Sequence, residues 1–350
     1  MKTRVITISD PEQQEKEIME AAQLLRSGQV VAFPTETVYG LGANALDAEA
    51  VGRIFKAKGR PSDNPLIVHI SDISTWHKLV EAIPKKALLL ADKFWPGPLT
   101  IILKKSKLVP EAVTAGLDTV GVRMPAHPAA LKLIELSGVP VAAPSANISG
   151  RPSPTSAQHV IEDMNGRIPM ILDGGKTEVG VESTVLDMTG SAPMVLRPGG
   201  VTVEMLQAAI GQVRIHPNVM RPVQKDEKVR SPGMKYVHYA PKAPVTLVRG
   251  ELNRQVEFIN KEAARLEKES KRAGILATDQ TLSRYQAGIR LSMGDRENPA
   301  DIAGKLFARL REFDELGVDA ILAEGVEEKE EGLAVMNRIA RAAGFHIIDL

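Results

Sequence analysis

The amino-acid sequence predicts an α/β protein with a large twisted sheet of mixed strand direction, followed by a small Rossmann-like domain. Short apolar runs that end at Pro or Gly alternate with segments of helical spacing through the first two thirds of the chain. A polar, proline-rich stretch then breaks the pattern at 211–242, and strands and helices alternate again after it. We therefore expect a large domain at 1–210, a linker at 211–242 and a second domain at 243–350.

Helices of the large domain are indicated by apolar residues at helical spacing and by proline or glycine at their ends. The first helix shows both signals, because Ile18 and Leu25 share one face and Gly28 follows as a C-cap. Pro84 separates two later helices. The expected helices are 12–27, 48–56, 73–83, 85–94, 128–137 and 157–164.

Strands of the large domain are short and apolar on both faces, which is typical of a buried sheet. The run 30–33 ends at Pro34, and the run 139–143 ends at Pro144. The expected strands are 30–33, 66–70, 99–104, 120–123, 139–143, 170–173, 183–188 and 194–197.

The second domain repeats a strand-helix pattern that predicts a doubly wound sheet. Its expected strands and helices are 245–248, 253–271, 274–278, 288–293, 299–316, 319–324 and 332–343. The sequence after its first strand is Arg-Gly-Glu-Leu-Asn rather than a G-x-G-x-x-G turn, which argues against dinucleotide binding there.

Composition limits the classes of function. The chain has 350 residues, of which 43% are hydrophobic and 25% charged, as in ordinary soluble proteins. Its net charge of +1 is too small for the whole molecule to attract nucleic acid or anionic lipid electrostatically. A site for an anion must therefore be a local pocket. With no cysteine there is no disulfide, zinc finger or thiol nucleophile. Neither a signal peptide nor a run of about 20 apolar residues is evident, so we expect a cytoplasmic protein without membrane contact.

A cationic loop lies between an expected helix and an expected strand. Lys56, Lys58 and Arg60 occur within five residues there, and the strand at 66–70 follows. The ammonium group of lysine and the guanidinium group of arginine, held at a strand edge, can bind a phosphate group. A solvated surface loop is the alternative reading, and it is about equally common.

Hydroxyl and cationic side chains follow other strands of the large domain, where α/β proteins place ligands. The loop 34–42 carries Thr35, Thr37 and two glycines, and it is either a close backbone approach to a ligand or a tight turn. Arg123 ends a short apolar strand and needs a partner, which is a substrate carboxylate or a structural carboxylate.

The loop 143–155 places small polar side chains between prolines, after a buried strand. Ser145, Asn147 and Ser153 are held by a rigid backbone, which suits phosphate and ribose recognition. The sequence contains no Walker loop, clustered His/Asp metal cage or G-x-S-x-G nucleophile, and its aromatic content of 4% offers few base-stacking platforms.

The linker is unusual for a spacer, because 231–241 includes two Tyr, one His and one Met. Such a segment packs against something, either the active cleft or only the two domains that it joins.

In combination these motifs resemble the YrdC-like family. Lys58-Gly59-Arg60 and Ser145-Ala146-Asn147 match its K-x-R…S-x-N signature. The surrounding text P-T-E-T-V-Y-G-L-G, N-P-L-I-V-H, P-G-P-L-T and V-G-V-R-x-P is similar as well. The linker and the C-terminal domain resemble the longer, two-domain form, the threonylcarbamoyl-AMP synthases. Val237 departs from that pattern, which has a basic residue between two aromatic positions.

The resemblance implies an adenylate-forming reaction. L-threonine, bicarbonate and ATP, the last with Mg²⁺ bound to it, would give L-threonylcarbamoyladenylate and pyrophosphate. Downstream transfer proteins would use this product to make threonylcarbamoyladenosine next to the tRNA anticodon. The nucleophile is an anionic carbamate, so catalysis rests on positioning and on neutralising phosphate charge.

The resemblance also implies roles for individual residues, with 1–210 as the catalytic domain. The catalytic residues would be Lys56, Lys58 and Arg60. The ATP-binding residues would be Lys58, Arg60, Asn64, Thr119, Ser145, Asn147, Ser153, Arg197 and Tyr239. The threonine-binding residues would be Thr35 or Thr37, His69, Arg123, Ala143 and Ser183. No protein-held metal is expected, and the linker would close over the adenylate through Tyr239 or Tyr236.

Alternatives stay open for His69 and for the class of the whole chain. His69 is either a ligand of the amino acid or a core histidine at a strand end. The chain as a whole is a synthase, an RNA-binding module on a cationic sheet face, or an O-carbamoyltransferase. Low net charge disfavours the RNA-binding module, and the absence of zinc-finger cysteines disfavours the O-carbamoyltransferase. The role of the C-terminal domain, the oligomeric state and direct tRNA binding are left undetermined.

Overall fold

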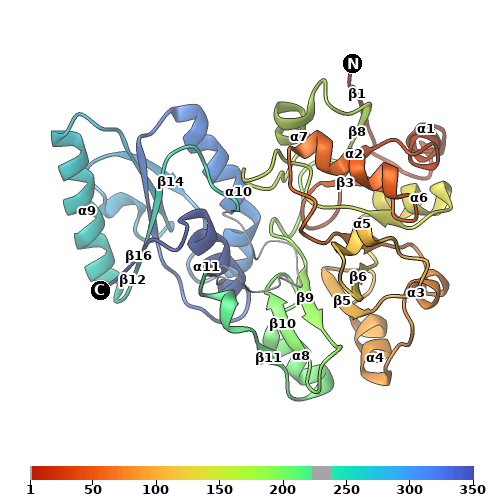
Figure 1. Cartoon of the computed structure of the whole chain (residues 1–350). Coiled ribbons are helices and arrows are strands. Elements are labelled where there is room, and N and C mark those ends of the chain that lie inside the picture. Colours follow the sequence, from red (N-terminus) through yellow and green to blue (C-terminus); the bar gives the residue numbers. More distant parts are fainter. Residues whose placement is uncertain (1, 223–237) are drawn as a thin grey trace. The chain divides into compact units, whose positions relative to one another are not determined.

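A computed structural model describes residues 2–222 and 238–350, and it confirms the α/β class. The described residues form two compact units (Figure 1). The first comprises 2–149 and 153–219, and the second comprises 150–152, 220–222 and 238–350. The linker residues 223–237 lie outside the described part, so the prediction that 211–242 closes over a site is not tested for them.

The first unit is built on a mixed sheet, as predicted. The strand order is β1-β8-β2-β3-β7-β4-β6-β5-β9-β10-β11. The sheet contains parallel pairs such as β4–β6 and antiparallel pairs such as β7–β4. The strands are β1 (Arg4–Thr7), β2 (Val31–Phe33), β3 (Gly40–Asn44), β4 (Ile67–His69), β5 (Leu99–Lys104), β6 (Thr119–Arg123), β7 (Val141–Ala142), β8 (Met170–Asp173), β9 (Thr184–Asp187), β10 (Met194–Arg197) and β11 (Arg214–Ile215).

Helices of the first unit pack their apolar faces on this sheet. Ile18 and Leu25 of α1 and Leu133 of α6 are buried against Phe33 of β2 and Leu172 of β8, and removal of this apolar surface from water stabilises the unit. The helices are α1 (Glu15–Arg26), α2 (Ala48–Lys58), α3 (Ile73–Leu79), α4 (Lys85–Phe94), α5 (Glu111–Thr114), α6 (Pro128–Ser137), α7 (Ala157–Met164) and α8 (Val203–Ile210), followed by a 3₁₀ turn at Pro217–Val219.

Helix α2 positions the cationic loop. Asp47 caps its N-terminus by accepting hydrogen bonds from the backbone N–H groups of Glu49 and Ala50. Gly59 ends the helix in the left-handed conformation with φ of 61°, which glycine adopts without a steric penalty. The helix therefore runs two residues beyond the predicted end at 56, and Lys58 is its last residue rather than a loop residue.

Other element predictions were wrong as well, and strands β1 and β11 and the short helix α5 were not predicted. The helix expected at 73–83 ends at Leu79, because Val80 is extended and bridges to Lys105. The loop expected at 34–42 already contains the start of β3 at Gly40. A Cβ at Gly40 or Gly42 would lie 3.1 Å or less from the ring of Phe33, so these glycines make room for that ring in the sheet.

Two tryptophans pack together in the first unit. Trp76 of α3 and Trp95, directly after α4, have ring centroids 4.6 Å apart. The indole N–H of Trp95 donates to the Leu99 carbonyl at 2.7 Å, which connects the end of α4 to the start of β5. Both rings are buried.

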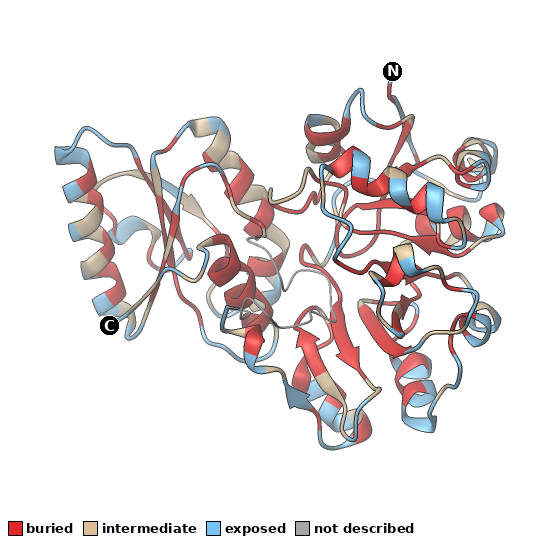
Figure 2. Ribbon diagram, viewed as in Figure 1, coloured by how far each residue is buried: buried red, intermediate tan, exposed pale blue. Residues whose placement is uncertain are grey.

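The second unit has a parallel sheet in the order β14-β13-β15-β12-β16. Helix α9 covers one face of the sheet, and α10 and α11 pack together on the other (Figure 1). Figure 2 shows the buried stripe of α9 and its exposed opposite side. The elements are β12 (Val245–Arg249), α9 (Leu252–Lys268), β13 (Ala273–Ala277), a 3₁₀ turn (Leu282–Arg284), β14 (Ile289–Ser292), α10 (Pro299–Leu316), β15 (Ala320–Glu324), α11 (Glu331–Ala342) and β16 (Ile347–Asp349).

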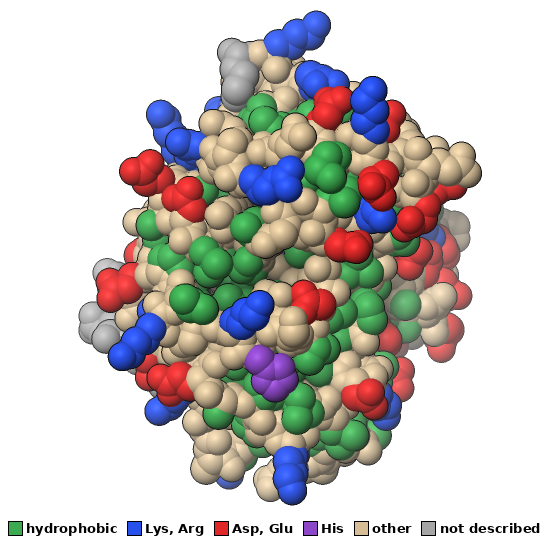
Figure 3. Space-filling model, turned by 90° about the vertical axis from the view of Figure 1, so that its right-hand side faces the viewer, with side chains coloured by type: hydrophobic (Ala, Val, Ile, Leu, Met, Phe, Trp, Pro, Cys, Tyr) green, Lys and Arg blue, Asp and Glu red, His purple; other side chains and the backbone are tan. Residues whose placement is uncertain are grey.

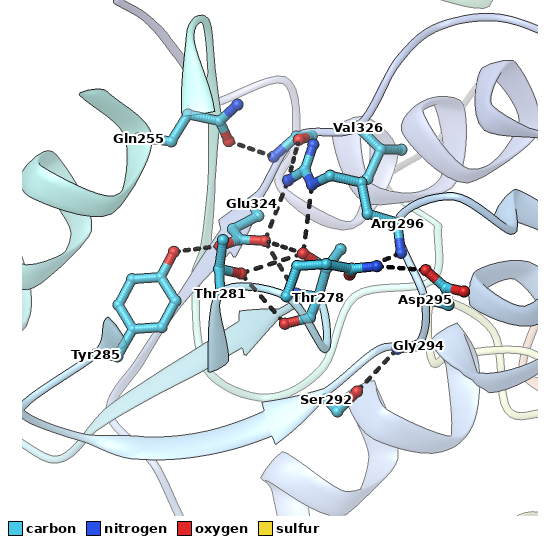
Figure 4. Close-up of polar contacts among 12 residues, drawn as sticks. Gln255, Thr278, Thr281, Tyr285, Ser292, Gly294, Asp295, Arg296, Glu324 and Val326 are labelled. Atoms are coloured by element: carbon cyan, nitrogen blue, oxygen red, sulfur yellow. Dashed lines mark hydrogen bonds and ion pairs between the residues drawn. The ribbon is translucent and has the colours of Figure 1, made fainter. Parts of the chain in front are cut away.

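A buried carboxylate joins the loops at the carboxyl edge of this second sheet (Figure 4). Glu324 is fully buried and accepts hydrogen bonds from the backbone N–H and the hydroxyl of Thr278, each at 2.9 Å. The Tyr285 hydroxyl donates to the same carboxylate, and Arg296 pairs with it at 3.2 Å. Burial, followed by the charge of Glu324, raises the pKa of Tyr285 well above its ordinary value. The network fixes the loops that follow β13, β14 and β15 relative to one another.

The surface carries both signs of charge. Lys and Arg side chains alternate with Asp and Glu on the face drawn in Figure 3, in keeping with the net charge of +1. Among residues 2–222 and 238–350, no helix combines the length and the apolar character that crossing a membrane requires.

Candidate active site

The sheet brings the end of β4 beside the end of β6. These strands are parallel, and His69 pairs in register with Arg123. On its other side, β4 pairs antiparallel with β7, so Ala143 and the loop that begins there lie beside Ile67, at the start of β4. Strand pairing therefore places His69 and Arg123 together at one edge of the sheet, and the start of the loop 143–155 at the opposite end of β4.

Arg123 is buried, with 4% of its surface exposed, and contacts the loop that follows β2. Its Nε donates to the Gly97 carbonyl at 3.1 Å, and Nη1 donates to the Thr37 hydroxyl at 2.9 Å. Nη2 forms an ion pair with Glu36 Oε1 at 2.7 Å. The structure thus contains the structural carboxylate that sequence analysis left open as a partner for Arg123.

The two threonines of this loop form a pair. The hydroxyl groups of Thr35 and Thr37 lie 2.8 Å apart, and the Thr35 hydroxyl donates to the Val38 carbonyl at 2.6 Å. Both residues are buried. Thr37 contacts Arg123, whereas Thr35 closes the turn behind it.

Arg197 and Ser183 form a second polar group at the adjacent strands β9 and β10. Nε of Arg197 donates to the Ser183 carbonyl at 3.0 Å, and Nη2 donates to its hydroxyl at 3.1 Å. The same hydroxyl lies 2.8 Å from that of Thr100 on β5. Ser183 is therefore oriented from both sides.

His69 is buried in a cationic environment. Burial, followed by the positive charges of Arg123 and Arg197, lowers its pKa from 6.5 to about 3. Within the described chain, His69 Nδ1 has no hydrogen-bond partner. The imidazole is therefore neutral near pH 7, with one ring nitrogen open to a ligand.

We expect this histidine to make the protein sensitive to acid. The native state keeps His69 neutral down to a pKa of about 3, whereas the unfolded chain takes up a proton near the ordinary value of 6.5. The free energy of unfolding should therefore fall as pH drops from 6.5 toward 3. Urea unfolding of wild type and His69→Asn across this window measures the effect, with the exposed His77→Asn as control. Equal slopes for all three proteins would contradict it.

Lys58 connects the two halves of the signature. The side chain is buried, with 2% exposed, and its ammonium donates to the carbonyls of Ser145 at 2.5 Å and Asn147 at 2.6 Å. The Ser145 hydroxyl donates to Asn147 Oδ1 at 2.5 Å. The K-x-R segment and the S-x-N segment, 87 residues apart in sequence, are thereby held in contact.

The other cationic-loop residues differ in exposure. Lys56 is exposed and Arg60 is half-buried, whereas Asn64 is almost fully buried, with 1% exposed. The structure provides no hydrogen-bond partner for either amide atom of Asn64 among the described residues. A buried amide without partners is rare in folded proteins, and contact of Asn64 with a ligand stays a prediction.

The remaining predicted residues lie in several places. Thr119 is buried at the start of β6, opposite Lys104 of β5, and the backbone N–H of Ala143 donates to the Ile67 carbonyl at 2.9 Å. Ser153 is fully buried and its hydroxyl donates to Glu182.

Tyr239 is a buried residue of the second unit. Its ring lies 5.1 Å from that of Phe307 on α10, and the guanidinium of Arg338 on α11 lies 5.5 Å from its centroid. Tyr236, the alternative to Tyr239, lies outside the described residues. Contact of either tyrosine with a nucleotide stays a prediction.

Sequence analysis missed three residues of this site: Glu36, Glu182 and Thr100. All three are buried and contact predicted site residues. Glu36 lies in a segment that the motifs had singled out, and Glu182 directly precedes the predicted site residue Ser183. A carboxylate in a loop nevertheless carries no sequence signal that it will be buried. No group of three or more His, Asp or Glu residues that could hold a metal ion occurs in 2–222 or 238–350.

Comparison with known proteins shows the family. A family model described as "Telomere recombination" matches residues 23–199, and one described as "Threonylcarbamoyl-AMP synthase, C-terminal domain" matches 201–344. A threonylcarbamoyl-AMP synthase of Pyrococcus abyssi is 53% identical over 335 residues, which cover 96% of this chain and 96% of the relative. The chain belongs to the threonylcarbamoyl-AMP synthase family. The resemblance found in the motifs is thus confirmed, as is the expectation of a nucleotidyltransferase-type enzyme.

Other relatives extend this agreement. A threonylcarbamoyl-AMP synthase of Bacillus subtilis is 48% identical over 348 residues, covering 99% of this chain and 97% of the relative. A crystal structure of P. abyssi Sua5 complexed with L-threonine is 52% identical with a TM-score of 0.94, covering 99% of this chain and all of the other. The fold of both units is therefore that of a threonylcarbamoyl-AMP synthase.

Proposed function

We propose that the protein synthesises L-threonylcarbamoyladenylate from L-threonine, bicarbonate and ATP, and that other proteins transfer the threonylcarbamoyl group to tRNA next to the anticodon. The observation that carries this proposal is the contact of Lys58 with Ser145 and Asn147, which joins the two halves of the family signature in one cationic site.

The phosphate end of the site would be formed by Lys58, Arg60 and Asn64, with Lys56 at its exposed rim. Cationic groups and amide donors placed before the substrate binds stabilise charge as it develops on the transferred phosphoryl group. The described residues offer hydroxyl, amide and cationic groups rather than a carboxylate cage, so Mg²⁺ would arrive on the phosphates of ATP. Ser153, Thr119 and Arg197 would contact the nucleotide.

The reaction needs two bond-forming steps. The α-ammonium of threonine gives up a proton to solvent, and the neutral amine then adds to bicarbonate with loss of water, which gives a carbamate anion. A carbamate oxygen then attacks the α-phosphorus of ATP, and pyrophosphate leaves. The attacking oxygen already carries negative charge, so this second step requires alignment more than a strong base.

The amino-acid end of the site would be the pocket around Arg123. A relative of 52% identity has been solved with L-threonine, which supports an amino-acid site in this fold. Arg123 would receive the carboxylate, while Thr37, Ser183 and His69 would shape the pocket. The open Nδ1 of a neutral His69 suits a hydroxyl partner.

The linker would contribute a contact to the adenylate. One structure of the P. abyssi relative has alanine in place of two adjacent residues, a histidine and the tyrosine that follows it. His238-Tyr239 is the one His-Tyr dipeptide of this sequence. Tyr239 is therefore the proposed nucleotide contact, in preference to Tyr236.

Pyrophosphate release by the purified protein tests this function. We expect release from ATP to require both threonine and bicarbonate, because each supplies part of the nucleophile. Omission of either should reduce the rate to that of the protein-free blank. Release that continues without threonine, or none with all three substrates, would refute the proposed function.

A further inference from the structure

Glu36 and Arg123 form a buried pair whose hydrogen-bonding capacity is incomplete. Their side chains are 7% and 4% exposed, and Nη2 lies 2.7 Å from Oε1. The alignment is nevertheless not that of a hydrogen bond. Among the described residues, Arg123 Nη2 and both carboxylate oxygens of Glu36 lack a hydrogen-bond partner. Buried charged groups with unused donors and acceptors cost more than satisfied ones, so a missing partner is indicated.

The rest of the guanidinium is already engaged. Nε is bound to Gly97 and Nη1 to Thr37, so Nη2 is the position left for a ligand. On the other side of the pair, the oxygens of Glu36 accept hydrogen bonds and donate none. The missing partner must therefore present an acceptor to Nη2 and an N–H or O–H donor to Glu36, a short distance apart.

An α-amino acid zwitterion meets this requirement. Its carboxylate and its ammonium are separated by one carbon atom, so one molecule can satisfy both members of the pair. Each contact joins opposite charges, which makes both hydrogen bonds charge-assisted. We propose that Glu36 binds the α-ammonium group of the amino-acid substrate, beside the carboxylate that Arg123 binds.

This inference rests on the proposed function for the identity of the amino acid. The other ionisable groups named at this pocket cannot pair with an ammonium group. Arg197 is cationic, and His69 is neutral near pH 7 because its pKa is lowered to about 3. Glu36 is therefore the residue of this group that discriminates for an amine, whereas the hydroxyl of Thr37 tolerates either a donor or an acceptor.

The test compares two ligands that differ only in the amine. L-threonine and (R)-3-hydroxybutanoate share the carboxylate and the hydroxyl, and the second has hydrogen in place of the α-ammonium. Titration calorimetry on the full chain, without ATP or bicarbonate, gives both affinities. The affinity of the weaker ligand is measured by competition against the tighter one. Wild type should prefer threonine by about 10- to 100-fold, the value of a charged hydrogen bond. Glu36→Gln should lose that preference and keep its affinity for (R)-3-hydroxybutanoate.

The contrary result is well defined. If Glu36 only orients Arg123, then Glu36→Gln lowers both affinities by the same factor, and the proposal fails. Should this variant not fold, equal affinity of wild type for the two ligands refutes the proposal by itself. The control is Glu178→Gln, because Glu178 is exposed and, like Glu36, acts electrostatically on His127; it should behave as wild type.

The outcome is separable from that of the proposed function. Selectivity for the amine that depends on Glu36, without threonine-dependent pyrophosphate release, would leave the ammonium site standing and remove the synthase. Threonine-dependent release with unchanged selectivity in Glu36→Gln would do the reverse.

Discussion

Replacement of Lys58 by methionine should lower turnover at saturating ATP and threonine by about 10²- to 10³-fold, the effect of removing one preorganised charged donor from an active site. Methionine keeps most of the side-chain volume and removes the ammonium. Steady-state pyrophosphate release measures the loss. Lys78→Ala is the matched control, because Lys78 is also in the last turn of a helix but is exposed, and it should retain full activity.

The same replacement should also destabilise the protein. Lys58 donates to two main-chain carbonyls, and leaving them without a donor costs about 1–3 kcal/mol for each group that stays buried. A phosphate-binding lysine in a solvated loop would show no such loss. Unfolding in urea therefore has to accompany the kinetics. If turnover falls only in proportion to the unfolded fraction, Lys58 has a structural role and no catalytic one.

Arg123→Ala should raise the KM for threonine by about 10- to 100-fold, since a charged hydrogen bond to the carboxylate is worth about 1.5–3 kcal/mol. The KM for ATP should change much less, and so should kcat at saturating threonine, because the interaction holds the substrate in the ground state and the transition state alike. Initial rates over a threonine series at fixed ATP provide the measurement. An unchanged threonine KM would make the contacts with Glu36, Thr37 and Gly97 the whole role of this residue.

Arg123→Ala also leaves Glu36 buried without its counter-charge, so a companion variant is required. Arg123→Lys keeps the charge next to Glu36 and loses the planar fork that matches a carboxylate. We expect it to fold like wild type and to show an intermediate threonine KM. If the lysine variant has a wild-type KM, charge alone is sufficient at this position.

Motifs in the sequence were sufficient to name segments that the structure brings into contact in the candidate site. Lys58, Arg123 and Ser145 could be named because K-x-R, V-G-V-R-x-P and S-x-N are specific in combination. What those residues contact could not be predicted. Glu36 and Thr37 are neighbours in sequence, yet only Thr37 was predicted as a site residue. Burial of the Glu36 carboxylate depends on where a distant strand places Arg123, and the sequence around Glu36 does not indicate this.

The elements of the fold were likewise predicted well where they depend on local sequence and poorly where they depend on distant residues. Strands with continuous apolar runs, such as β8 and β10, were predicted with their exact bounds. Strand β3 was missed because its first three residues include Gly40 and Gly42, which have low strand propensity and are required there by the ring of Phe33 and, at Gly42, by the side chain of Val141. Helix α2 extends two residues beyond its predicted end at 56. Lys58 continues the helix into a buried position, which is favourable because its ammonium donates hydrogen bonds to two distant carbonyls.

The packed pair of Trp76 and Trp95 has a spectroscopic consequence. The chain contains two tryptophans, and both belong to the first unit. Their emission therefore reports on the unit that holds Lys58 and Arg123, whereas the second unit contributes no indole signal. Circular dichroism of the amide bonds samples the helices of both units. A denaturant titration followed by both signals thus separates the unfolding of the site-bearing unit from that of its C-terminal neighbour, with no label attached.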